Sequence, residues 1–530
     1  FWSNPMAVRL KIPAVVDKPL IPAETRPQKI AQFIHTLPAA NPMEAAGSLL
    51  EELENMNRQA LPSDTRLKAL EIYRPAIINL AEHLASQYCS APLPLPAAAK
   101  NAARVAESLW QELGYGYKLA LIDQQSKLFN LASKKSVAFI VYRAIEAVSQ
   151  LAMVYYQTYF PPPGSIWSDL HQLYLYAVQQ SLHDVEIAVD EEPGKMVTVE
   201  LAYKRALLMP LADPQHLAPN DIKQVADYIA RFAQHAELQG MGVLENPVGI
   251  FVVRLDTDKP PVPYVKNQDQ TDAETDILLI TVDLARLIHK HLQMLQSGNP
   301  PPSSGLPANA NDPRYLSMLT YLIQHWGVSP KRVFNRSRKN DSIELGIGIG
   351  AAHYFMNGQK HYEPPGDGND ISVDGDFTNI TAARNHRASR WQVLNISAGG
   401  MALRKLPAVE ETVRVGELLS VRNEKEARWS VGVLRWANNG PEQLEVGAQL
   451  IAPEAKAGGA KAVDKQKFEP VLILPAIAAL KQTPSIVAGN GLYSPARVLD
   501  LEEDGKISRI MVTKLIERTN SFERFQFSYL

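Results

Sequence analysis

The N-terminal half of the chain repeats apolar residues at spacings of three and four, which is the pattern of amphipathic helices. Asn41-Pro42 and Ser63-Asp64 are helix start signals. After the second signal an apolar stripe is formed by Leu67, Leu70, Tyr73, Ile77, Leu80 and Leu84. Further helices are predicted over 97–110, 118–132, 134–159, 166–188, 197–209 and 219–239. Long helices that lack internal Gly and Pro indicate a helical bundle or a short solenoid.

The pattern changes to short β-branched runs after Gly249. Residues 250–255 and 277–282 predict two strands, and a helix over about 283–295 follows them. A stretch rich in Pro, Ser, Gly and Asn then predicts a linker, from which a helix at about 313–326 leads onward.

From Ser342 the apolar positions alternate with a period of two, which is the pattern of half-buried strands. The predicted strands cover 343–355, 390–395, 400–405, 418–422, 427–437 and 443–452. Repeated short strands with turn signals predict a small antiparallel barrel. Residues 357–389, rich in Gly, Asp and Asn, would form an inserted loop. Gly346-x-Gly348-x-Gly350 falls inside the first strand, where it favours barrel curvature over nucleotide binding.

A second group of short strands is predicted near the C-terminus, over 471–474, 485–487, 493–501, 506–518 and 522–527. The elements together predict a multidomain α+β protein with a mostly α-helical N-terminal bundle or solenoid, an antiparallel β-barrel and a small C-terminal β-rich module. The expected boundaries are an extended arm over 1–24, a helical domain over 25–296 with a strand pair near 250–282, a linker and connecting helix over 297–327, a barrel over 328–452, a linker over 453–467 and a C-terminal module over 468–530.

Length and composition limit the class of protein. A chain of 530 residues is expected to form about three domains. Its formal net charge of −2 gives no global attraction to nucleic acid or anionic membranes, so an anion site must be a local basic cluster. The single cysteine, Cys89, excludes an internal disulfide framework and favours a reducing compartment.

The sequence was also searched for segments that would direct the chain to a membrane or out of the cell. No signal peptide and no run of about 18 apolar residues is found, so we expect a cytoplasmic protein without membrane insertion. Phe1–Pro5 look like a cloning remnant that precedes a native start at Met6.

A basic run from Lys331 to Lys339 carries the strongest candidate chemistry. It places Arg332 and Arg336 four positions apart, with Arg338 as a further candidate contact. A guanidinium donates paired hydrogen bonds to a phosphate or a guanine edge and can stack on a ring face. Two arginines at this spacing could therefore clamp an anion from one side.

A polar turn between two predicted strands offers complementary groups. Asn395 and Ser397 are short donor-acceptor side chains that could recognise a purine edge. Gly400 would allow a positive φ and a close approach of the backbone to a ligand.

The order Arg-x-x-x-Arg, then Asn-x-Ser-x-x-Gly, then barrel strands resembles the signature of the PilZ family, bacterial β-barrels that bind cyclic di-GMP. Residues 391–403 are similar to the strand-turn-strand of that family, and 432–436 and 446–450 are similar to its closing strands. The resemblance covers roughly residues 328–452. The interval between the two halves of the motif is longer than the family usually shows, because of the inserted loop.

The resemblance also implies roles for the motif residues. Arg332 and Arg336 would clamp phosphate and guanine. Asn395 and Ser397 would hydrogen-bond a guanine, and Gly400 would shape the turn.

The function implied by the resemblance is that of a bacterial cyclic di-GMP receptor, with outputs such as motility, pili or biofilm control. Repulsion within the basic run would keep this segment mobile, and the dianionic ligand would order it over the barrel. The helical domain would be the output or the surface for a protein partner, because the basic run directly follows its connecting helix.

Other functions stay open at this point. A barrel that has lost its ligand would serve as a scaffold for protein interactions. An RNA- or single-strand-binding barrel could use the same basic run, but it would need aromatic side chains interleaved on an exposed sheet. An enzyme in the helical domain would need a polar cluster that the sequence does not reveal, since no Gly-x-Ser-x-Gly, Walker or His-Glu-x-x-His motif is present. No catalytic residue, metal site, cofactor or DNA partner is expected.

Overall fold

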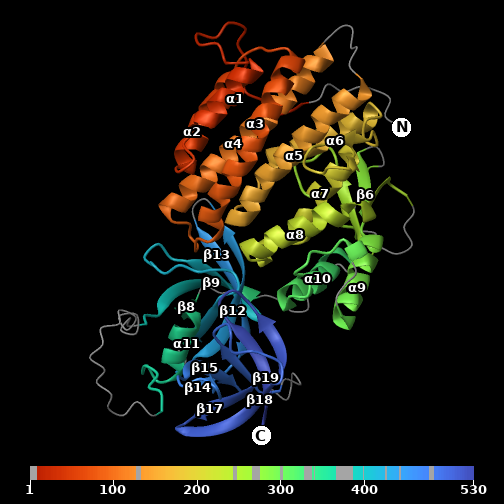
Figure 1. Cartoon of the computed structure of the whole chain (residues 1–530). Coiled ribbons are helices and arrows are strands. Elements are labelled where there is room, and N and C mark those ends of the chain that lie inside the picture. The colour runs from red at the N-terminus through yellow and green to blue at the C-terminus, as the bar shows by residue number, and fades with distance from the viewer. Residues whose placement is uncertain are drawn as a thin grey trace. The chain divides into compact units, whose positions relative to one another are not determined.

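The computed structural model describes residues 9–126, 133–242, 248–265, 272, 275–298, 302–327, 341–365, 386–397, 399–423, 427–440, 443–476 and 483–530, and the backbone of residues 337–338. The chain divides into two compact units (Figure 1). The helical unit comprises residues 1–91, 95–214 and 219–331, and the two-barrel unit comprises residues 92–94, 215–218 and 332–530.

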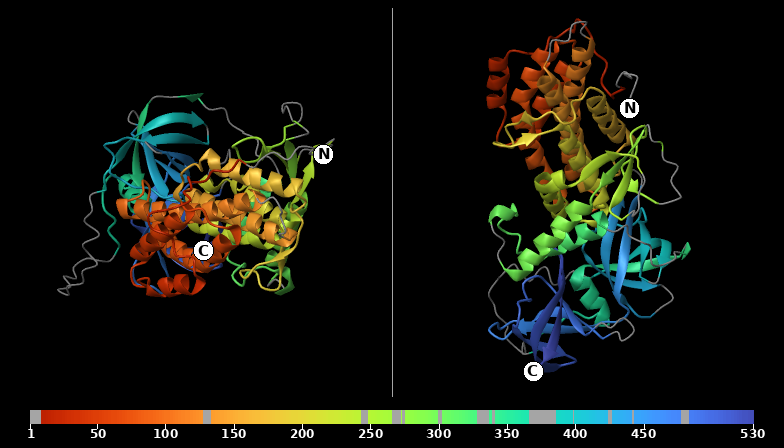
Figure 2. Two further views of the ribbon diagram at one scale, coloured as in Figure 1. Left: turned by 90° about the horizontal axis from the view of Figure 1, so that it is seen from above. Right: turned by 90° about the vertical axis from the view of Figure 1, so that its right-hand side faces the viewer.

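The helical unit is built around three long helices that lie side by side (Figures 1 and 2), namely α3 (Ser63–Cys89), α4 (Ala97–Ser126) and α5 (Lys134–Thr158). The shorter helices are α1 (Pro27–Thr36), α2 (Pro42–Asn57), α6 (Gly164–Gln179), α7 (Val199–Leu211) and α8 (Pro219–Phe232). The predicted start of α2 is confirmed. The Asn41 side chain accepts a hydrogen bond from the Glu44 backbone at 3.3 Å, which caps the helix, and it donates one to the Glu44 carboxylate at 3.0 Å.

Helix α4 is a single helix where two were predicted, over 97–110 and 118–132; residues 127–132 lie outside the described part. Gly114 and Gly116 lie in its middle, and each lowers helix propensity by roughly 1 kcal/mol. Packing against α3 needs a glycine here, because a Cβ added at Gly116 would lie 2.5 Å from Cδ2 of Leu70. The close approach of the two helices therefore outweighs the local preference.

Two predicted helices end earlier than expected. The helix predicted over 166–188 stops at Gln179, and the chain turns through a positive φ of 52° at Ser181 into β1 (Ile187–Ala188), which pairs with β2 (Met196–Val197). The helix predicted over 219–239 stops at Phe232, and β3 (Glu237–Gly240) follows.

A buried ion network joins α3, α5 and the β1–β2 turn. The Arg143 side chain is 2% exposed and lies 2.9 Å from Glu146, 3.0 Å from Glu191 and 3.1 Å from Glu71. Arg74 lies 2.9 Å from Glu146 and 2.8 Å from Glu191. Because removal of one partner would leave a buried charge uncompensated, this network fixes how these elements pack.

Helix α5 also meets the length and composition test for a membrane span, with a hydropathy of 1.5 over its best window. In the structure 67% of that window is buried inside the protein, and the helix carries the paired charges of Arg143 and Glu146. The central helix of a bundle has the same properties.

His171 on α6 predicts a pH dependence of the helical unit. Its Nδ1 lies 2.6 Å from the Tyr203 hydroxyl and its Nε2 lies 2.8 Å from the Lys259 carbonyl, which fits a neutral ring that donates through Nε2. Burial lowers the pKa of His171 to about 4. Below its ordinary pKa of about 6.5 the unfolded chain binds a proton that the folded chain excludes, so acid favours unfolding.

We expect the unfavourable protonation of His171 to lower the free energy of unfolding by about 2 kcal/mol as the pH falls from about 7.5 to about 5. Urea unfolding of the helical unit at both pH values checks it, with His171→Gln, which does not titrate, as the test variant. His83→Gln, at an exposed histidine, is the control. An unchanged pH dependence in His171→Gln would contradict the prediction.

After α8 the chain forms a small antiparallel sheet of order β3-β6-β4-β5. Its remaining strands are β4 (Ile250–Arg254), β5 (Val262–Pro263) and β6 (Asp276–Ile280). The strand pair predicted near 250–282 is confirmed by β4 and β6. Helices α9 (Val282–Ser297) and α10 (Pro313–Trp326) pack against each other, and both belong to the helical unit.

The first barrel of the two-barrel unit, here the middle barrel, has strand order β10-β13-β12-β11-β8-β9-β7. An additional β10–β9 pairing makes β8 to β13 a ring, with β7 at its edge. The strands are β7 (Ser337–Arg338), β8 (Ser342–Ile347), β9 (Ser389–Ser397), β10 (Gly400–Lys405), β11 (Leu418–Asn423), β12 (Ser430–Asn439) and β13 (Leu444–Ala452). The predicted antiparallel barrel is confirmed.

The long strand predicted over 343–355 is wrong in its second half. The strand ends at Ile347, Gly348 has a φ of +87°, and residues 348–356 form helix α11 (Gly348–Met356). Period-two alternation stops here because helix α11 packs Phe355 against Trp429, with ring centroids 4.3 Å apart. The three glycines therefore mark a strand-to-helix junction instead of a curved strand.

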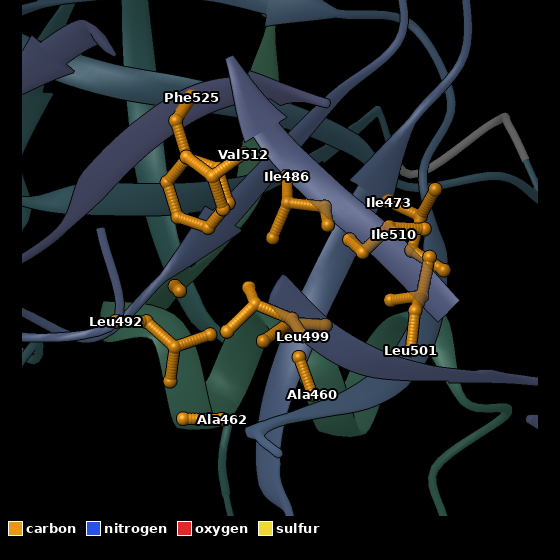
Figure 3. Packing of buried hydrophobic residues seen from close by; sticks show 12 residues of the cluster. Ala460, Ala462, Ile473, Ile486, Leu492, Leu499, Leu501, Ile510, Val512 and Phe525 are labelled. Carbon is orange, nitrogen blue, oxygen red and sulfur yellow. The ribbon is translucent and has the colours of Figure 1, made fainter. Parts of the chain in front are cut away.

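The C-terminal barrel is closed, with strand order β14-β15-β16-β19-β18-β17. Its strands are β14 (Lys456–Ala462), β15 (Glu469–Leu474), β16 (Ser485–Ala488), β17 (Val498–Glu503), β18 (Lys506–Arg518) and β19 (Glu523–Tyr529). Figure 3 shows its interior, where residues such as Ile486, Leu499 and Phe525 converge. The linker expected over 453–467 is wrong in part, because its small residues form β14, which pairs with both β15 and β17.

The two barrels share a hydrophobic core. The middle barrel and α11 contribute Ala352, Leu418, Val431, Val433, Ile451 and Ala452, and the C-terminal barrel contributes Leu472, Leu474, Val487 and Phe522. His353 of α11 adds a polar contact, with Nε2 3.0 Å from the Gly458 carbonyl. The barrels are therefore packed as one body.

Candidate ligand-binding site

The polar turn predicted from the sequence is the hairpin between β9 and β10. Its register pairs Ser397 with Gly400 and Asn395 with Ala402. The Ser397 hydroxyl donates a hydrogen bond to the Gly400 carbonyl at 3.2 Å, which holds the turn closed. The register shifts after Ala402, so that β9 carries a bulge next to Asn395. The half-buried Asn395 amide has no hydrogen-bond partner within the described part of the chain.

Gly400 is required for a different reason than expected. Its φ is not positive, so conformational freedom is not the cause. A Cβ at this position would lie 2.3 Å from the carbonyl oxygen of Ala448 on β13. Only glycine allows β10 to approach β13 this closely where the hairpin begins.

A cavity of about 280 Å³ opens beside this hairpin. Its walls come from β9, β10, β12 and β13, and they consist of Asn395, Ser397, Gly399, Gly400, Met401, Ala402, Arg435, Trp436, Gly447, Ala448 and Gln449. The Trp436 ring lies over Gly447, its partner across the strands, where an added Cβ would fall 1.8 Å from the indole nitrogen. The cavity thus combines an aromatic wall with polar groups at one end.

A bulge on β12 brings two neighbouring side chains into this cavity. Leu434 pairs with Ala448 and Trp436 pairs with Gly447, which leaves Arg435 as the extra residue. In a regular strand Arg435 and Trp436 would point to opposite faces, whereas a bulge re-aims one of them. Both therefore line the same cavity.

The sequence-predicted site residues are only partly placed. Asn395, Ser397 and Gly400 lie together at the cavity. Arg332 and Arg336 lie outside the described residues. Arg338 belongs to β7, and its backbone pairs with Asn395 on β9. The end of the basic run therefore adjoins the polar turn, although about sixty residues separate them in the sequence.

Arg435, Trp436 and Gln449 are cavity residues that sequence reasoning did not identify as site residues. In the sequence, the stretch 432–436 shows only a similarity to a closing strand of the barrel. Regular alternation along β12 would direct Arg435 and Trp436 to opposite faces of the sheet. No local sequence pattern indicates the bulge that brings both to one cavity. Among the residues that the structure describes, no group of three or more His, Cys, Asp or Glu side chains could hold a metal ion.

Comparison with known families covers nearly the whole chain. The family model described as the N-terminal domain of the cyclic-di-GMP receptor FimW matches residues 28–244. Its middle PilZ domain matches residues 250–371 and 367–457, and the FimW C-terminal β-barrel domain matches residues 458–530. The chain belongs to the FimW family of cyclic-di-GMP receptors. FimW of Pseudomonas aeruginosa is 24% identical over 578 residues, which cover 98% of this chain and 93% of that protein.

Membership of the FimW family confirms the PilZ resemblance and the expected receptor class. The FimW middle-domain match starts at residue 250, upstream of the barrel predicted from residue 328. In the structure, residues 250–327 pack with the helical unit. The FimW C-terminal match starts at residue 458, inside β14.

Proposed function

We propose that this chain binds cyclic di-GMP at the cavity beside Asn395, Ser397 and Gly400, with Arg332 and Arg336 of the basic run as the other half of the site. The observation that carries the proposal is the pairing of β7 with β9. It sets the backbone of Arg338 against Asn395, whose side chain lines the cavity. The end of the basic run and the polar turn, which are distant in sequence, are thus adjacent in the fold, and this supports the placing of Arg332 and Arg336 near the same cavity.

The cavity has the chemistry of a guanine site. An amide such as Asn395 can both donate to and accept from a purine edge, and a hydroxyl such as Ser397 can do either. Trp436 offers an aromatic face on which a base can stack, an interaction worth roughly 1–3 kcal/mol. A volume of about 280 Å³ lies just below the range of small-molecule pockets, which starts at roughly 300 Å³, so the cavity suits one base better than a whole dinucleotide.

The remainder of the ligand would be held by the basic run. Cyclic di-GMP carries two phosphates, and guanidinium groups bind phosphate through paired, charge-assisted hydrogen bonds. Neutralisation of Lys331, Arg332, Arg336, Arg338 and Lys339 by the ligand would order the run over the barrel. The family of receptors supports this class of ligand, and the mechanism is our proposal.

Ordering of the basic run would act on the helical unit, because residues 313–326 directly precede the run in sequence. We propose that the helical unit is the output of a cytoplasmic receptor and binds a protein partner that controls motility, pili or biofilm formation. Small-angle scattering with and without saturating cyclic di-GMP tests the change of arrangement. An unchanged scattering profile would refute this step.

The test of the binding function is a calorimetric titration of the purified protein with cyclic di-GMP. We expect binding by the unaltered protein, at least about tenfold weaker binding by Arg336→Ala, and no binding of GMP at the same concentration. Arg286→Ala removes an exposed arginine that pairs with Asp283 three residues away on α9, and it should leave binding unchanged. Absence of binding by the unaltered protein would favour a structural scaffold, and binding of single-stranded RNA in its place would favour a nucleic-acid-binding barrel.

A further inference from the structure

Arg435 connects the proposed ligand cavity to the C-terminal barrel. Its side chain lines the cavity, and both of its terminal nitrogens donate to the carboxylate of Glu517 on β18. The Nη2–Oε2 distance is 3.0 Å. Its Nε donates to Oε1 of Gln449, another cavity residue, at 2.7 Å. The guanidinium is thus held by one group from each barrel.

These contacts hold the guanidinium of Arg435 in place and use only some of its N–H groups. A guanidinium has five N–H donors, and Arg435 uses three of them in the bonds to Glu517 and Gln449. The side chain is 31% exposed, and that of Glu517 is 21% exposed. The other two donors have no partner among the residues that the structure describes, and the planar group is held at the cavity wall, which lowers the entropy lost when a ligand binds.

The surroundings of Glu517 keep this corner positive. In the β18–β19 register Glu517 lies opposite Arg524, whose Nε donates to the Ser485 hydroxyl at 3.0 Å. One carboxylate therefore lies between two guanidinium groups, and the three side chains together carry one net positive charge. A phosphate that approaches Arg435 meets a positive corner even though Arg435 is already paired.

We propose that Arg435 is a third ligand-binding arginine, and that Glu517 of the C-terminal barrel is the positioning residue that orients it toward a phosphate oxygen of the ligand. The proposal rests on the proposed function. It gives the C-terminal barrel a direct part in the site: the middle barrel supplies the cavity, and the C-terminal barrel holds one of its ligand-binding groups in place.

A double-mutant cycle tests this coupling. Calorimetric titration with cyclic di-GMP should show roughly 10- to 100-fold weaker binding for Arg435→Gln, which loses a charge-assisted contact. Glu517→Gln should bind roughly three- to tenfold more weakly, since the arginine keeps its charge but loses its orientation. The double variant should bind no more weakly than Arg435→Gln alone, because Glu517 acts only through Arg435.

A matched control is present in the same barrel. Arg404 and Glu445 pair at 2.8 Å across β10 and β13 with similar exposures of 32% and 30%, and neither lines the cavity. Glu445→Gln should therefore change the affinity by less than about twofold. Arg435→Lys keeps the charge but not the planar fork, so it should restore the salt dependence of binding and only part of the affinity.

The outcomes separate the two proposals. No binding by the unaltered protein would refute the proposed function, and this inference with it. Binding that survives unchanged in folded Arg435→Gln and Glu517→Gln would refute the inference alone and leave the pair as a contact between barrels. Tighter binding by Glu517→Gln would also refute it, because Glu517 would then compete with the ligand. Thermal unfolding of each variant, and the retained charge in Arg435→Lys, distinguish loss of contact from loss of fold.

Discussion

Replacement of Phe522 by alanine should lower the free energy of unfolding of the two-barrel unit by about 3–5 kcal/mol. Phe522 has no exposed surface, and its ring packs in the core that both barrels share. The same core contains Leu418 and Val433 of the middle barrel and Leu472 of the C-terminal barrel. The cavity left by the ring would therefore remove apolar contacts from both barrels at once.

Hydrogen exchange followed by mass spectrometry checks this effect strand by strand. We expect faster exchange in β11 and β12 of the middle barrel as well as in β18 and β19 of the C-terminal barrel, because the two share one core. Tyr529→Ala, at an aromatic side chain on β19 that is 60% exposed, should change stability by less than about 0.5 kcal/mol. Faster exchange confined to β14–β19 would show that the barrels unfold independently.

Much of this fold follows from local periodicity. The strand over 400–405 agrees with β10 residue for residue, and the alternating segments between 389 and 452 all form strands. Errors arise where tertiary packing overrides the local pattern. Gly116 lies within a continuous helix because the Leu70 side chain occupies the space beside it. The small residues of 456–462 form a strand because they pair both with the next strand, β15, and with β17, which is distant in sequence.

The sequence predicts those residues of the candidate site that belong to one contiguous motif. Asn395, Ser397 and Gly400 belong to one hairpin. Their proximity therefore follows from the predicted strand-turn-strand. Arg435 and Trp436 could not be found that way, because a register shift between β12 and β13 brings both into the cavity. The partner of Arg435, Glu517, lies in another barrel altogether. The roles of Arg332 and Arg336 stay predictions, since these residues lie outside the described part of the chain.

Replacement of Gly447 by alanine should weaken cyclic di-GMP binding by roughly 5- to 150-fold, which corresponds to the loss of a stacking contribution of roughly 1–3 kcal/mol. The added Cβ would occupy the place of the Trp436 indole, whose nitrogen lies 1.8 Å from that position. Trp436 pairs directly with Gly447 across β12 and β13, so the ring cannot keep its pose by a small shift. The indole would turn into the cavity or away from it, and either movement removes the aromatic wall on which a guanine would stack.

Calorimetric titration of three variants separates this steric effect from damage to the barrel. Gly489→Ala adds a methyl group in the same unit where nothing lies within 4 Å, and it should bind like the unaltered protein. Trp436→Ala should lose the stacking contribution of roughly 1–3 kcal/mol while keeping the barrel intact. If Gly447→Ala acts only through Trp436, adding it to Trp436→Ala should weaken binding no further, because the smaller side chain leaves room for the methyl group. Unchanged affinity in folded Gly447→Ala would place the guanine elsewhere than against Trp436, since no pose of the indole over Gly447 survives that substitution.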